Sequence, residues 1–383
     1  MIYFDNASTS FPKAPGVGQA MERLVSGAGY NVNRGGYAGA YQVENIVYET
    51  RELLCRLFGG PGPRNVILTG GVTCALNCIL KGFLKPGDHV LTTSMEHNAV
   101  MRPLNQLKGT GVEFDAALAD PDGSLPLSRI QALKRPNTRL LIMTHASNVC
   151  GAVLPAPQAG EWAKQNGIRF VADVAQTAGV LPISMKEMHA DALAFPGHKG
   201  LLGPQGIGGF VITDEFAREI EPLIAGGTGS VSDTEEVPPF LPDRFEGGTM
   251  NLPGVAGLNA ALRYLMETGV EAIGETEMGL ASRFLQGAAG LAGARVAGPA
   301  GTAGRVAVVS LDFTGAGLDN AEVSYRLDQE YGIMTRCGMH CAPRAHKTLG
   351  TFPQGTVRFA FGRENTPQEV ETCLGALKTI LDK

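Results

Sequence analysis

The sequence predicts an α/β protein in which a mainly parallel β-sheet is covered by helices on both faces and is joined to a smaller α/β domain. Two observations predict this fold class. Short apolar runs alternate with amphipathic or Ala/Leu-rich stretches up to about residue 255, and longer helical patterns follow. The 383 residues, of which 44% are hydrophobic and 18% charged, are enough for one large domain and a smaller one, each with its own core.

Short apolar runs in the first part of the chain are the strand candidates. They are NVILT (65–69), HVLTT (89–93), RLLIMTH (139–145), IRFVAD (168–173), DALAFPGH (191–198) and GIGGFVI (206–212). Stretches such as VTCALNCILKGFL (72–84) and PAPQAGEWAKQNG (155–167) are long enough to form crossover helices. This alternation favours a mainly parallel sheet that is buried on both faces.

The last part of the chain has a different pattern. Helices are expected at 258–269 and 271–290, a strand at 306–313, a helix at 320–332, a strand at 356–361 and a closing helix at 367–383. This order predicts a smaller α/β lobe.

Charge and hydropathy exclude several classes of protein. The formal charge of −5 gives no electrostatic reason to expect nucleic acid or an anionic membrane as a partner. The first twenty residues lack a basic segment followed by an apolar one, and no run of eighteen apolar residues occurs. We therefore expect a cytoplasmic protein whose partner is a small molecule.

Seven cysteines are scattered along the chain, which is an odd number and makes a disulfide framework improbable. Two of them, Cys337 and Cys341, lie in RCGMHCAP (336–343). The nearest further metal ligands are His340 and His346, and no second CxxC pair exists to complete a tetrahedral site. We therefore predict no metal site here.

Polar residues at the carboxyl ends of the predicted strands are the candidate functional residues, because ligands of open parallel sheets bind there. TGGVT (69–73) opens a helix and suits an anion, although such turns are often only turns. His97 begins the next helix and Asp173 closes a strand, and either side chain alone is more often a helix cap. Lys199 follows His198 in a glycine-rich loop, where a solvated lysine is the simpler interpretation.

The four features together favour pyridoxal 5'-phosphate (PLP) as the cofactor. PLP needs a phosphate anchor, a stacking partner for its ring, a carboxylate for its pyridinium nitrogen and a lysine for covalent attachment. TGGVT matches neither the GxGxxG motif of dinucleotide sites nor the GxxxxGK[ST] motif of nucleotide sites.

Stretches along nearly the whole chain resemble the class V aminotransferase group of fold-type I PLP enzymes, and within it the SUF-type cysteine desulfurases. They are FDNASTSFPK, TGGVTCALN, MEHNAV, HASNVCGAVLP, VADVAQTAG, GHKGLLGPQGIGG, FEGGTMN, RCGMHCAP and VRFAFGRENT. The resemblance implies a large PLP-binding domain at 15–255 with a mainly parallel seven-stranded sheet. It also implies a small α/β domain, formed by 1–14 and 256–383, that carries the catalytic cysteine loop.

The resemblance assigns cofactor contacts residue by residue. The lysine of the GHK motif, which binds PLP covalently, is here Lys199, and His198 lies beside it near the phosphate. The carboxylate of the DxAQ motif pairs with the pyridine nitrogen and is here Asp173, while Gln176 approaches the phenolic oxygen. The histidine after ME, which stacks on the ring and belongs to the catalytic group, is here His97.

The resemblance also implies how the phosphate is bound. Gly71, Val72 and Thr73 match the phosphate cradle. Val72 and Pro196 stand where hydroxyl residues are common in the family, which implies fewer phosphate contacts. Thr249 of FEGGTMN resembles a threonine that reaches the phosphate of the neighbouring subunit, so a homodimer with shared sites is implied.

Substrate recognition carries over in the same way. Asn148 and Arg358 match the clamp on the substrate carboxylate, with Arg336 close by, and Asn148 is also expected at the cofactor. An arginine fork suits a planar carboxylate better than lysine does. Cys341 occupies the catalytic position of the GxHCA motif, which leaves Cys337 as a bystander or a resolving thiol.

The implied reaction converts L-cysteine to L-alanine and leaves a persulfide on Cys341 for a sulfur-acceptor protein. Three alternatives stay open. A selenocysteine lyase shares all these residues and acts on L-selenocysteine, whereas an aminotransferase or racemase keeps Lys199 and Asp173 without needing Cys341. A binding protein with a decayed site is the third alternative, and the intact lysine and carboxylate oppose it.

Overall fold

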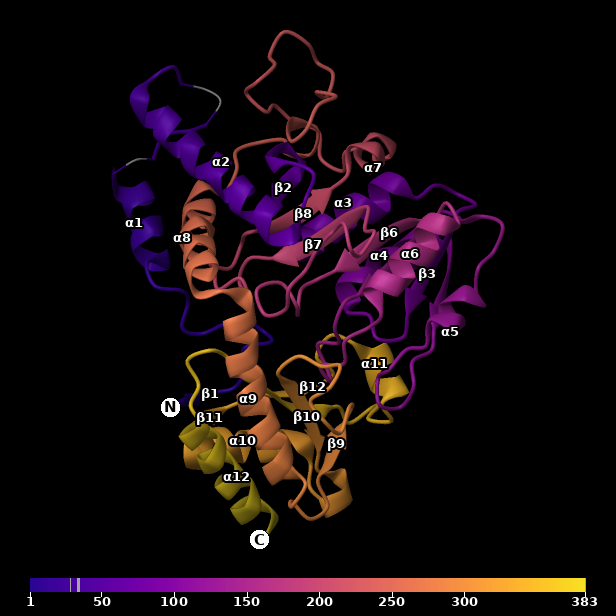
Figure 1. Ribbon diagram of the computed structural model, residues 1–383, viewed down its shortest axis with the longest axis vertical. Helices are drawn as coiled ribbons and strands as arrows, with labels where there is room; N and C mark the ends of the chain where they lie inside the picture. The colour runs from indigo at the N-terminus through magenta and orange to yellow at the C-terminus, as the bar shows by residue number, and fades with distance from the viewer. Residues whose placement is uncertain (28, 33–34, 383) are drawn as a thin grey trace.

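The computed structural model describes residues 1–27, 29–32 and 35–382, and its architecture is the predicted α/β class. The described residues form a seven-stranded sheet, a four-stranded sheet and a pairing of two short strands. Figure 1 shows the large sheet with its helices in the upper part and the small sheet with its helices in the lower part, where both chain ends lie. The predicted number of strands in the large sheet is confirmed.

The large sheet contains β2 (Val66–Thr69), β3 (His89–Thr93), β4 (Glu113–Ala117), β5 (Thr138–Thr144), β6 (Arg169–Asp173), β7 (Ala192–Pro196) and β8 (Gly208–Ile212). Their order across the sheet is β2-β8-β7-β6-β5-β3-β4, and all are parallel except β8, which runs antiparallel to both its neighbours. The sequence pattern missed β4, because this edge strand carries exposed Glu113 and half-buried Asp115 and has no continuous apolar run.

The helices that accompany this sheet are α1 (Val17–Gly27), α2 (Ala38–Phe58), α3 (Val72–Phe83), α4 (Asn98–Lys108), α5 (Leu127–Gln131), α6 (Ala156–Gln165), α7 (Asp214–Glu219) and α8 (Leu252–Thr268), with short 3-10 turns η1 (Pro63–Asn65) and η2 (Asp243–Phe245). Strand alternation divides the core in two. Leu141 and Met143 of β5 pack in a cluster with α1, α2, α6 and α8, whereas Leu140 and Ile142 pack with α3, α4 and α7. The predicted burial of the sheet on both faces is confirmed.

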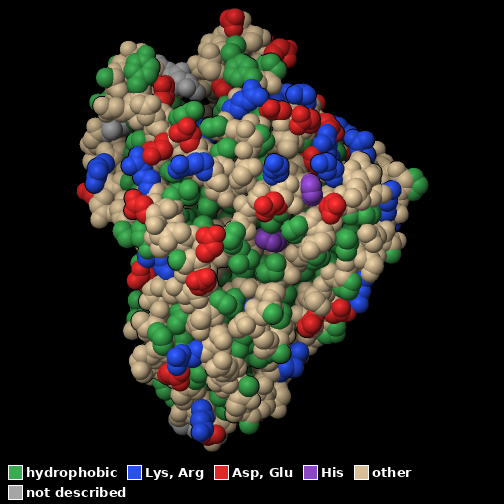
Figure 2. Space-filling model, in the orientation of Figure 1, with side chains coloured by type: hydrophobic (Ala, Val, Ile, Leu, Met, Phe, Trp, Pro, Cys, Tyr) green, Lys and Arg blue, Asp and Glu red, His purple; other side chains and the backbone are tan. Residues whose placement is uncertain are grey.

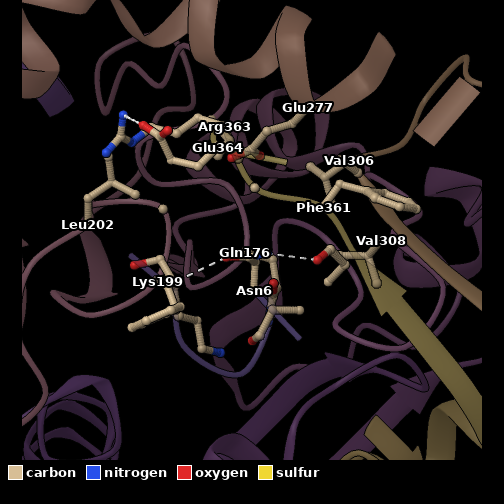
Figure 3. A pocket seen from close by; sticks show the side chains of 18 of the residues that line it. Asn6, Gln176, Lys199, Leu202, Glu277, Val306, Val308, Phe361, Arg363 and Glu364 are labelled. Atoms are coloured by element: carbon tan, nitrogen blue, oxygen red, sulfur yellow. Dashed lines mark hydrogen bonds and ion pairs between the residues drawn. The ribbon is translucent and has the colours of Figure 1, made fainter. Parts of the chain in front are cut away.

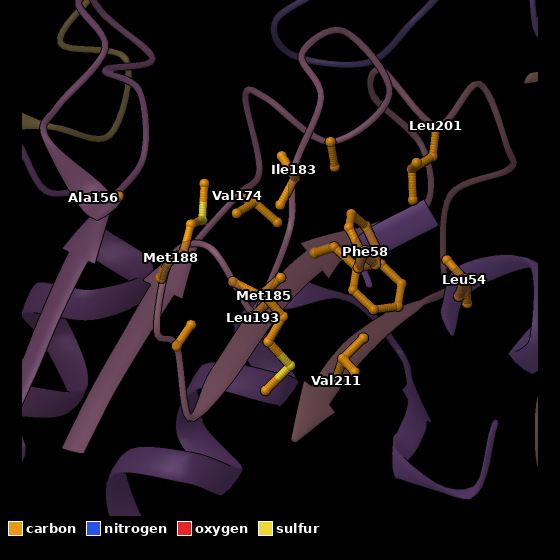
Figure 4. Close-up of a cluster of buried hydrophobic side chains, with 14 of the residues drawn as sticks. Leu54, Phe58, Ala156, Val174, Ile183, Met185, Met188, Leu193, Leu201 and Val211 are labelled. Carbon is orange, nitrogen blue, oxygen red and sulfur yellow. The ribbon is translucent and has the colours of Figure 1, made fainter. Parts of the chain in front are cut away.

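The first of these clusters is shown in Figure 4, where Phe58 of α2 lies against the sheet. The rings of Phe58 and Phe195 are 5.2 Å apart between centroids. Burial of an aromatic side chain of this size contributes about 1.5–3 kcal/mol. The cluster therefore fixes the strands whose carboxyl ends carry the candidate site.

The small sheet has the strand order β12-β13-β10-β9 and is antiparallel. Its elements are α9 (Val270–Ala288), β9 (Arg295–Ala297), β10 (Val308–Asp312), η3 (Thr314–Ala316), α10 (Asn320–Tyr331), β11 (Ile333–Met334), β12 (Arg336–Gly338), α11 (Pro343–Thr348), β13 (Thr356–Ala360) and α12 (Pro367–Leu381). The N-terminal strand β1 (Ile2–Tyr3) pairs in parallel with β11, so the first residues of the chain lie beside this lobe.

The long helices α8 and α9 follow one another but pack in different cores. Leu258 and Leu262 of α8 belong to the first cluster of the large sheet, whereas Leu280 and Phe284 of α9 pack in the core of the small sheet. The predicted domain boundary at residue 255 stays a prediction.

Among the described residues, none of the helices has the length and apolar character needed to cross a membrane. Figure 2 shows acidic and basic side chains interspersed over the face in view. Hydrophobic side chains are visible on the two lobes at the top of that face.

Candidate active site

The ends of parallel strands bring three of the predicted residues to one edge of the large sheet. Asp173 is the last residue of β6, Lys199 follows the end of β7, and His97 lies just beyond β3. These strands are parallel, so their carboxyl ends meet at the same edge. The sequence prediction that these side chains converge agrees with this arrangement, while their catalytic roles stay predictions.

Lys199 is half-buried in the turn after β7, and its environment favours the neutral amine. Burial lowers the pKa of Lys199 to about 8, with Arg358 and Arg336 adding to the effect and Asp173 opposing it. Among the described residues, none forms a hydrogen bond with the Lys199 amine. The amine is therefore available to react.

Asp173 is a buried carboxylate with 2% of its surface exposed. One oxygen accepts a hydrogen bond from the Ala175 backbone N–H at 3.0 Å. Burial raises the pKa of Asp173, and the charge of Lys199 opposes this shift.

A second buried carboxyl group, which the sequence analysis missed, lies near Asp173. Glu96 is fully buried, and it accepts hydrogen bonds from the Thr93 hydroxyl at 2.5 Å and from the Thr144 backbone N–H at 3.0 Å. Burial raises the pKa of Glu96 to about 8; the charge of Asp173 acts in the same direction, and the hydrogen bonds from Thr93 and Thr144 oppose the shift. A carboxyl group with this pKa is mostly protonated at pH 7. Glu96 belongs to the motif SMEHNAV, and nothing in this motif except the neighbouring histidine indicates that the glutamate is a buried site residue.

His97 is the N-cap of α4, as the sequence analysis considered more common for a single histidine at the start of a helix. Its Nδ1 accepts a hydrogen bond from the Ala99 backbone N–H at 3.0 Å, which leaves the proton of the neutral ring on Nε2. Burial lowers the pKa of His97 to about 4, and the charges of Lys199, Arg336 and Arg358 add to this. The capping bond thus fixes an uncharged ring at the site.

The predicted phosphate cradle is an open helix N-terminus. Gly71 precedes α3 with a φ of 136°, and no side chain of the described residues caps this helix. A Cβ on Gly208 would lie 2.9 Å from the Gly71 Cα, so glycine at 208 permits this close approach. Val72 packs against the second core cluster, whereas Thr73 belongs to the first turn of α3. Beside Lys199, the buried Nδ1 of His198 has no hydrogen-bond partner among the described residues.

Two predicted arginines, Arg336 and Arg358, stand directly opposite each other on β12 and β13. Arg358 is 1% exposed and donates to Asp5 at 2.8 Å and to the Asn148 carbonyl at 2.9 Å. The Nε of Arg358 is buried without a partner among the described residues. Both guanidinium groups also donate to the hydroxyl of Ser8, at 2.7 Å from Arg358 and 2.8 Å from Arg336.

The loop that carries Cys341 is hydrogen-bonded to segments that follow β3 and β5 of the large sheet. Its backbone carbonyl accepts from the Asn98 N–H at 2.8 Å, and the Asn148 side-chain amide donates to the His340 carbonyl at 2.7 Å. His340 and Cys341 have φ angles of 48° and 56°, a left-handed conformation that non-glycine residues seldom adopt. The Cys341 side chain is exposed, and its Sγ lies 3.7 Å from Nη2 of Arg336.

The second cysteine of this motif points elsewhere. Side chains alternate along β12, so Cys337 faces away from Arg336. Burial raises the pKa of Cys337 to about 11, and Asp319 of the neighbouring helix cap adds to this. This orientation favours the interpretation of Cys337 as a bystander.

The histidines near these cysteines bond to each other. His340 Nδ1 lies 3.2 Å from His346 Nε2, and His346 Nδ1 lies 2.7 Å from the Thr351 hydroxyl. Among the residues that the structure describes, no three His, Cys, Asp or Glu side chains are grouped as metal ligands.

The two remaining predicted cofactor residues, Gln176 and Thr249, differ in where they lie. Gln176 donates to the Ala7 carbonyl at 3.2 Å, and together with Lys199 it lines a cavity of about 40 Å³. Figure 3 shows Lys199 and Gln176 on one side of this cavity, with Glu277 and Arg363 on the other. Thr249 is exposed in the 221–250 segment before α8, and its reach into a neighbouring subunit stays a prediction.

The sequence analysis also overlooked Asp5 and Ser8 as site residues. Both lie in FDNASTS, directly after β1, and the signal was a run of small polar side chains that follows a strand. Asp5 also forms a parallel bridge with Ala360, which holds this segment beside β13.

The model of the family described as aminotransferase class-V matches residues 2–373. The chain belongs to this family. Class V aminotransferases use PLP, so membership implies this cofactor. The resemblance found in the sequence motifs is thereby confirmed.

Several relatives carry the name of cysteine desulfurase. A probable cysteine desulfurase of Pyrococcus abyssi is 33% identical over 388 residues, which cover 100% of this chain and 94% of the relative. A probable cysteine desulfurase of Mycolicibacterium paratuberculosis is also 33% identical over the whole of this chain, but the chain spans only 56% of its length.

Solved structures agree with the fold. The apo structure of cysteine desulfurase from Thermococcus onnurineus NA1 matches with a TM-score of 0.91 at 33% identity, covering 100% of this chain and 94% of that one. The cysteine desulfurase CsdA (S-sulfonic acid) from Escherichia coli matches with a TM-score of 0.88 at 28% identity, covering 99% and 94%. A NifS-like protein at 23% identity supports the fold alone. The predicted PLP fold type I is confirmed.

The described residues fit PLP. A lysine amine without a hydrogen-bond partner is placed near a buried carboxylate, as covalent attachment and pairing with a pyridinium nitrogen require. The open N-terminus of α3 and the unpartnered Nδ1 of His198 suit an anionic phosphate.

Proposed function

We propose that this protein is a PLP-dependent cysteine desulfurase that converts L-cysteine to L-alanine and retains the sulfur as a persulfide on Cys341. One observation carries the proposal. Cys341 presents an exposed thiol 3.7 Å from the Arg336 guanidinium, in a loop whose backbone is bonded to the helix that begins at His97. An aminotransferase or racemase has no use for a thiol in this position. The desulfurase names of the relatives support the same activity.

The residues that would bind PLP are those of the sheet edge. Lys199 would attach it covalently, Asp173 would pair with the ring nitrogen, and His97 would cover the ring. The backbone of Gly71, Val72 and Thr73 would receive the phosphate, together with His198. Bound there, PLP supplies an electron sink that makes the bonds around the substrate α-carbon labile.

The side chains of the chain itself would bind the substrate and move protons. Arg358 has a buried Nε without a partner in the described structure, and this donor suits the α-carboxylate of an amino acid. Lys199, with a pKa lowered to about 8, is partly neutral near physiological pH and can accept a proton from the α-carbon. Neutral His97 adds no charge that would compete with the substrate amine.

Cys341 would take the sulfur. Its thiolate attacks the substrate sulfur, a sulfur–sulfur bond forms as the carbon–sulfur bond breaks, and the persulfide stays on the enzyme. The guanidinium of Arg336 stabilises the negative charge on the attacking sulfur. An acceptor protein would then remove the sulfur, and we expect the reaction in the cytoplasm.

We further propose that the enzyme works as a homodimer. Large hydrophobic side chains are exposed on α2, the residues before it and the 221–250 segment. They are Tyr30, Tyr37, Tyr41, Tyr48, Leu223, Ile224 and Phe240. Such an apolar surface is typical of an interface. Exposed Thr249 lies in the same segment, as a residue that serves the partner's phosphate site would.

The test is to incubate the enzyme with L-cysteine and separately with L-selenocysteine, and to measure alanine together with sulfide or selenide. Lys199→Ala should abolish both reactions and the visible absorbance of the bound cofactor. Cys341→Ala should retain cofactor binding but lose cysteine desulfuration, and mass spectrometry should find the persulfide on Cys341 in the native enzyme.

Cys337→Ala is the matched control, because it removes the other thiol of the same motif, and it should desulfurate cysteine at close to the native rate. A native rate in Cys341→Ala, or a persulfide on Cys337, would refute the proposal in favour of an aminotransferase-like enzyme. Alanine formed from selenocysteine alone would identify a selenocysteine lyase.

A further inference from the structure

The two arginines of the site form an unfavourable pair that the rest of the chain has to stabilise. Arg336 and Arg358 are directly opposed on antiparallel strands, and like charges in this position repel each other. Arg358 is almost fully buried, which increases the cost of its charge. The groups that hold the two guanidiniums therefore decide where each of them points.

Ser8 contacts both arginines at once and uses its full hydrogen-bonding capacity. Its hydroxyl donates to Asp5 Oδ1 at 2.7 Å. It accepts from Nη1 of Arg336 at 2.8 Å and from Nη2 of Arg358 at 2.7 Å. A hydroxyl has one donor and two acceptor sites, so no bond of Ser8 is left for another group.

The two arginines depend on Ser8 to different extents. Arg358 keeps two further bonds, to Asp5 at 2.8 Å and to the Asn148 carbonyl at 2.9 Å. The guanidinium of Arg336, among the described residues, contacts only Ser8 and the Cys341 sulfur. Loss of the Ser8 hydroxyl would release Arg336 but leave Arg358 in place.

We propose that Ser8 is a positioning residue that holds Arg336 against the Cys341 sulfur and leaves Arg358 to the substrate carboxylate. This inference deepens the proposed function and rests on it for the identity of the substrate. Asp5 neutralises one of the two positive charges, so the cluster of Asp5, Ser8, Arg336 and Arg358 keeps a net positive charge for an anion. Ser8 thereby links the carboxylate clamp to the nucleophile.

The experiment measures the reactivity of Cys341 without turnover. The PLP-loaded enzyme, without substrate, is treated with iodoacetamide at neutral pH, and alkylation of the Cys341 peptide is followed by mass spectrometry. A hydrogen bond to a charged group corresponds to about tenfold in an equilibrium constant. Ser8→Ala should therefore slow alkylation of Cys341 by up to about tenfold, and Arg336→Ala should slow it at least as much. The double variant should be no slower than Arg336→Ala alone, because both changes remove the same contact.

A second pair of variants separates the hydroxyl from side-chain size. Ser8→Thr keeps the hydroxyl, so Cys341 should be alkylated at close to the native rate. Ser8→Val has the shape of threonine but lacks the hydroxyl, so alkylation of Cys341 should be slow. Ser184→Ala is the remote control, because among the described residues its hydroxyl takes part in one hydrogen bond, from the Glu187 backbone N–H, and it should leave alkylation unchanged. Steady-state kinetics with L-cysteine add a further readout: kcat should fall with alkylation in Ser8→Ala, while KM should change less, since Arg358 keeps its other bonds.

Native alkylation rates in Ser8→Ala and Ser8→Val would overturn the inference, and so would a native rate in Arg336→Ala. If alkylation follows the expected order but the native enzyme forms no alanine from cysteine, the positioning role stands and the proposed function fails. If kcat/KM falls in Ser8→Ala through a higher KM alone, with kcat unchanged, Ser8 belongs to the carboxylate clamp instead, and this result would also overturn the inference.

Discussion

Glu96→Gln should change how the stability of the protein depends on pH, because the native carboxyl group is buried in its neutral form. The amide of glutamine has the shape of a protonated carboxylic acid and can accept from the Thr144 N–H while donating to the Thr93 hydroxyl. The variant therefore resembles the protonated native enzyme but cannot ionise.

The magnitude follows from the two pKa values. The pKa of Glu96 is about 8 in the folded protein against an ordinary value of 4.5. Between these values the folded state holds a proton that the unfolded chain has lost, so the free energy of unfolding falls as pH rises. The slope is about 1.4 kcal/mol per pH unit for one proton. The stabilising contribution is complete below the unfolded pKa and is lost as pH rises through the folded pKa.

The measurement is equilibrium unfolding in urea at one protein concentration and several pH values. Relative to the native enzyme, Glu96→Gln should gain about 2.7 kcal/mol between about pH 5.5 and pH 7.5, and the difference should level off above the folded pKa. Glu277→Gln is the matched control at another site, because burial also raises the pKa of Glu277 to about 8 and the same slope is expected. A difference between Glu96→Gln and the native enzyme that stays constant with pH would show that the carboxyl is ionised in the fold.

Two further predictions concern the cysteine loop and the interface. His346→Phe removes the buried hydrogen-bond partner of His340. Sulfur transfer should fall by about tenfold, while the visible absorbance of bound PLP should stay near that of the native enzyme. If PLP binding falls to the same extent as sulfur transfer, His346 has a general structural role instead. If Thr249 serves a neighbouring site, dilution of the native enzyme to monomer should lower its affinity for PLP, whereas dilution of Thr249→Ala should cause no additional loss of affinity. Fluorescence titration with PLP at several protein concentrations measures this. A native monomer that binds PLP as tightly as the dimer would contradict the prediction.

Patterns in the sequence predicted the strand ends well, since burial on both faces leaves a continuous apolar run. Asp173 closes such a run and lies at the end of β6, as expected. The edge strand β4 was missed for the converse reason, because one side of it faces solvent and Glu113 interrupts the apolar pattern. The same limit applies to Glu96, whose burial comes from packing between β3 and β5 and leaves no trace in local composition.

Contacts over long sequence separations were the least predictable part of the site. Ser8 and Arg336 are 328 positions apart, and the pairing of β1 with β11 and the bridge between Asp5 and Ala360 bring them together. Motif resemblance identified Arg336, Arg358 and Asn148 individually. It did not indicate that the Asn148 amide binds the loop of Cys341, because that bond depends on how the two sheets face each other.

The site is therefore divided between two packed units, and hydrogen bonds around the site join them. The large sheet provides Lys199 and Asp173, whereas the strands of the small sheet provide Arg336 and Arg358. The bonds from Asn98 to Cys341 and from Asn148 to His340 cross between them. The same two bonds hold the loop of Cys341 in place, while the Cys341 side chain itself stays exposed. An exposed sulfur on a fixed loop suits the proposed sulfur transfer, because an acceptor could then reach it without any movement of the loop.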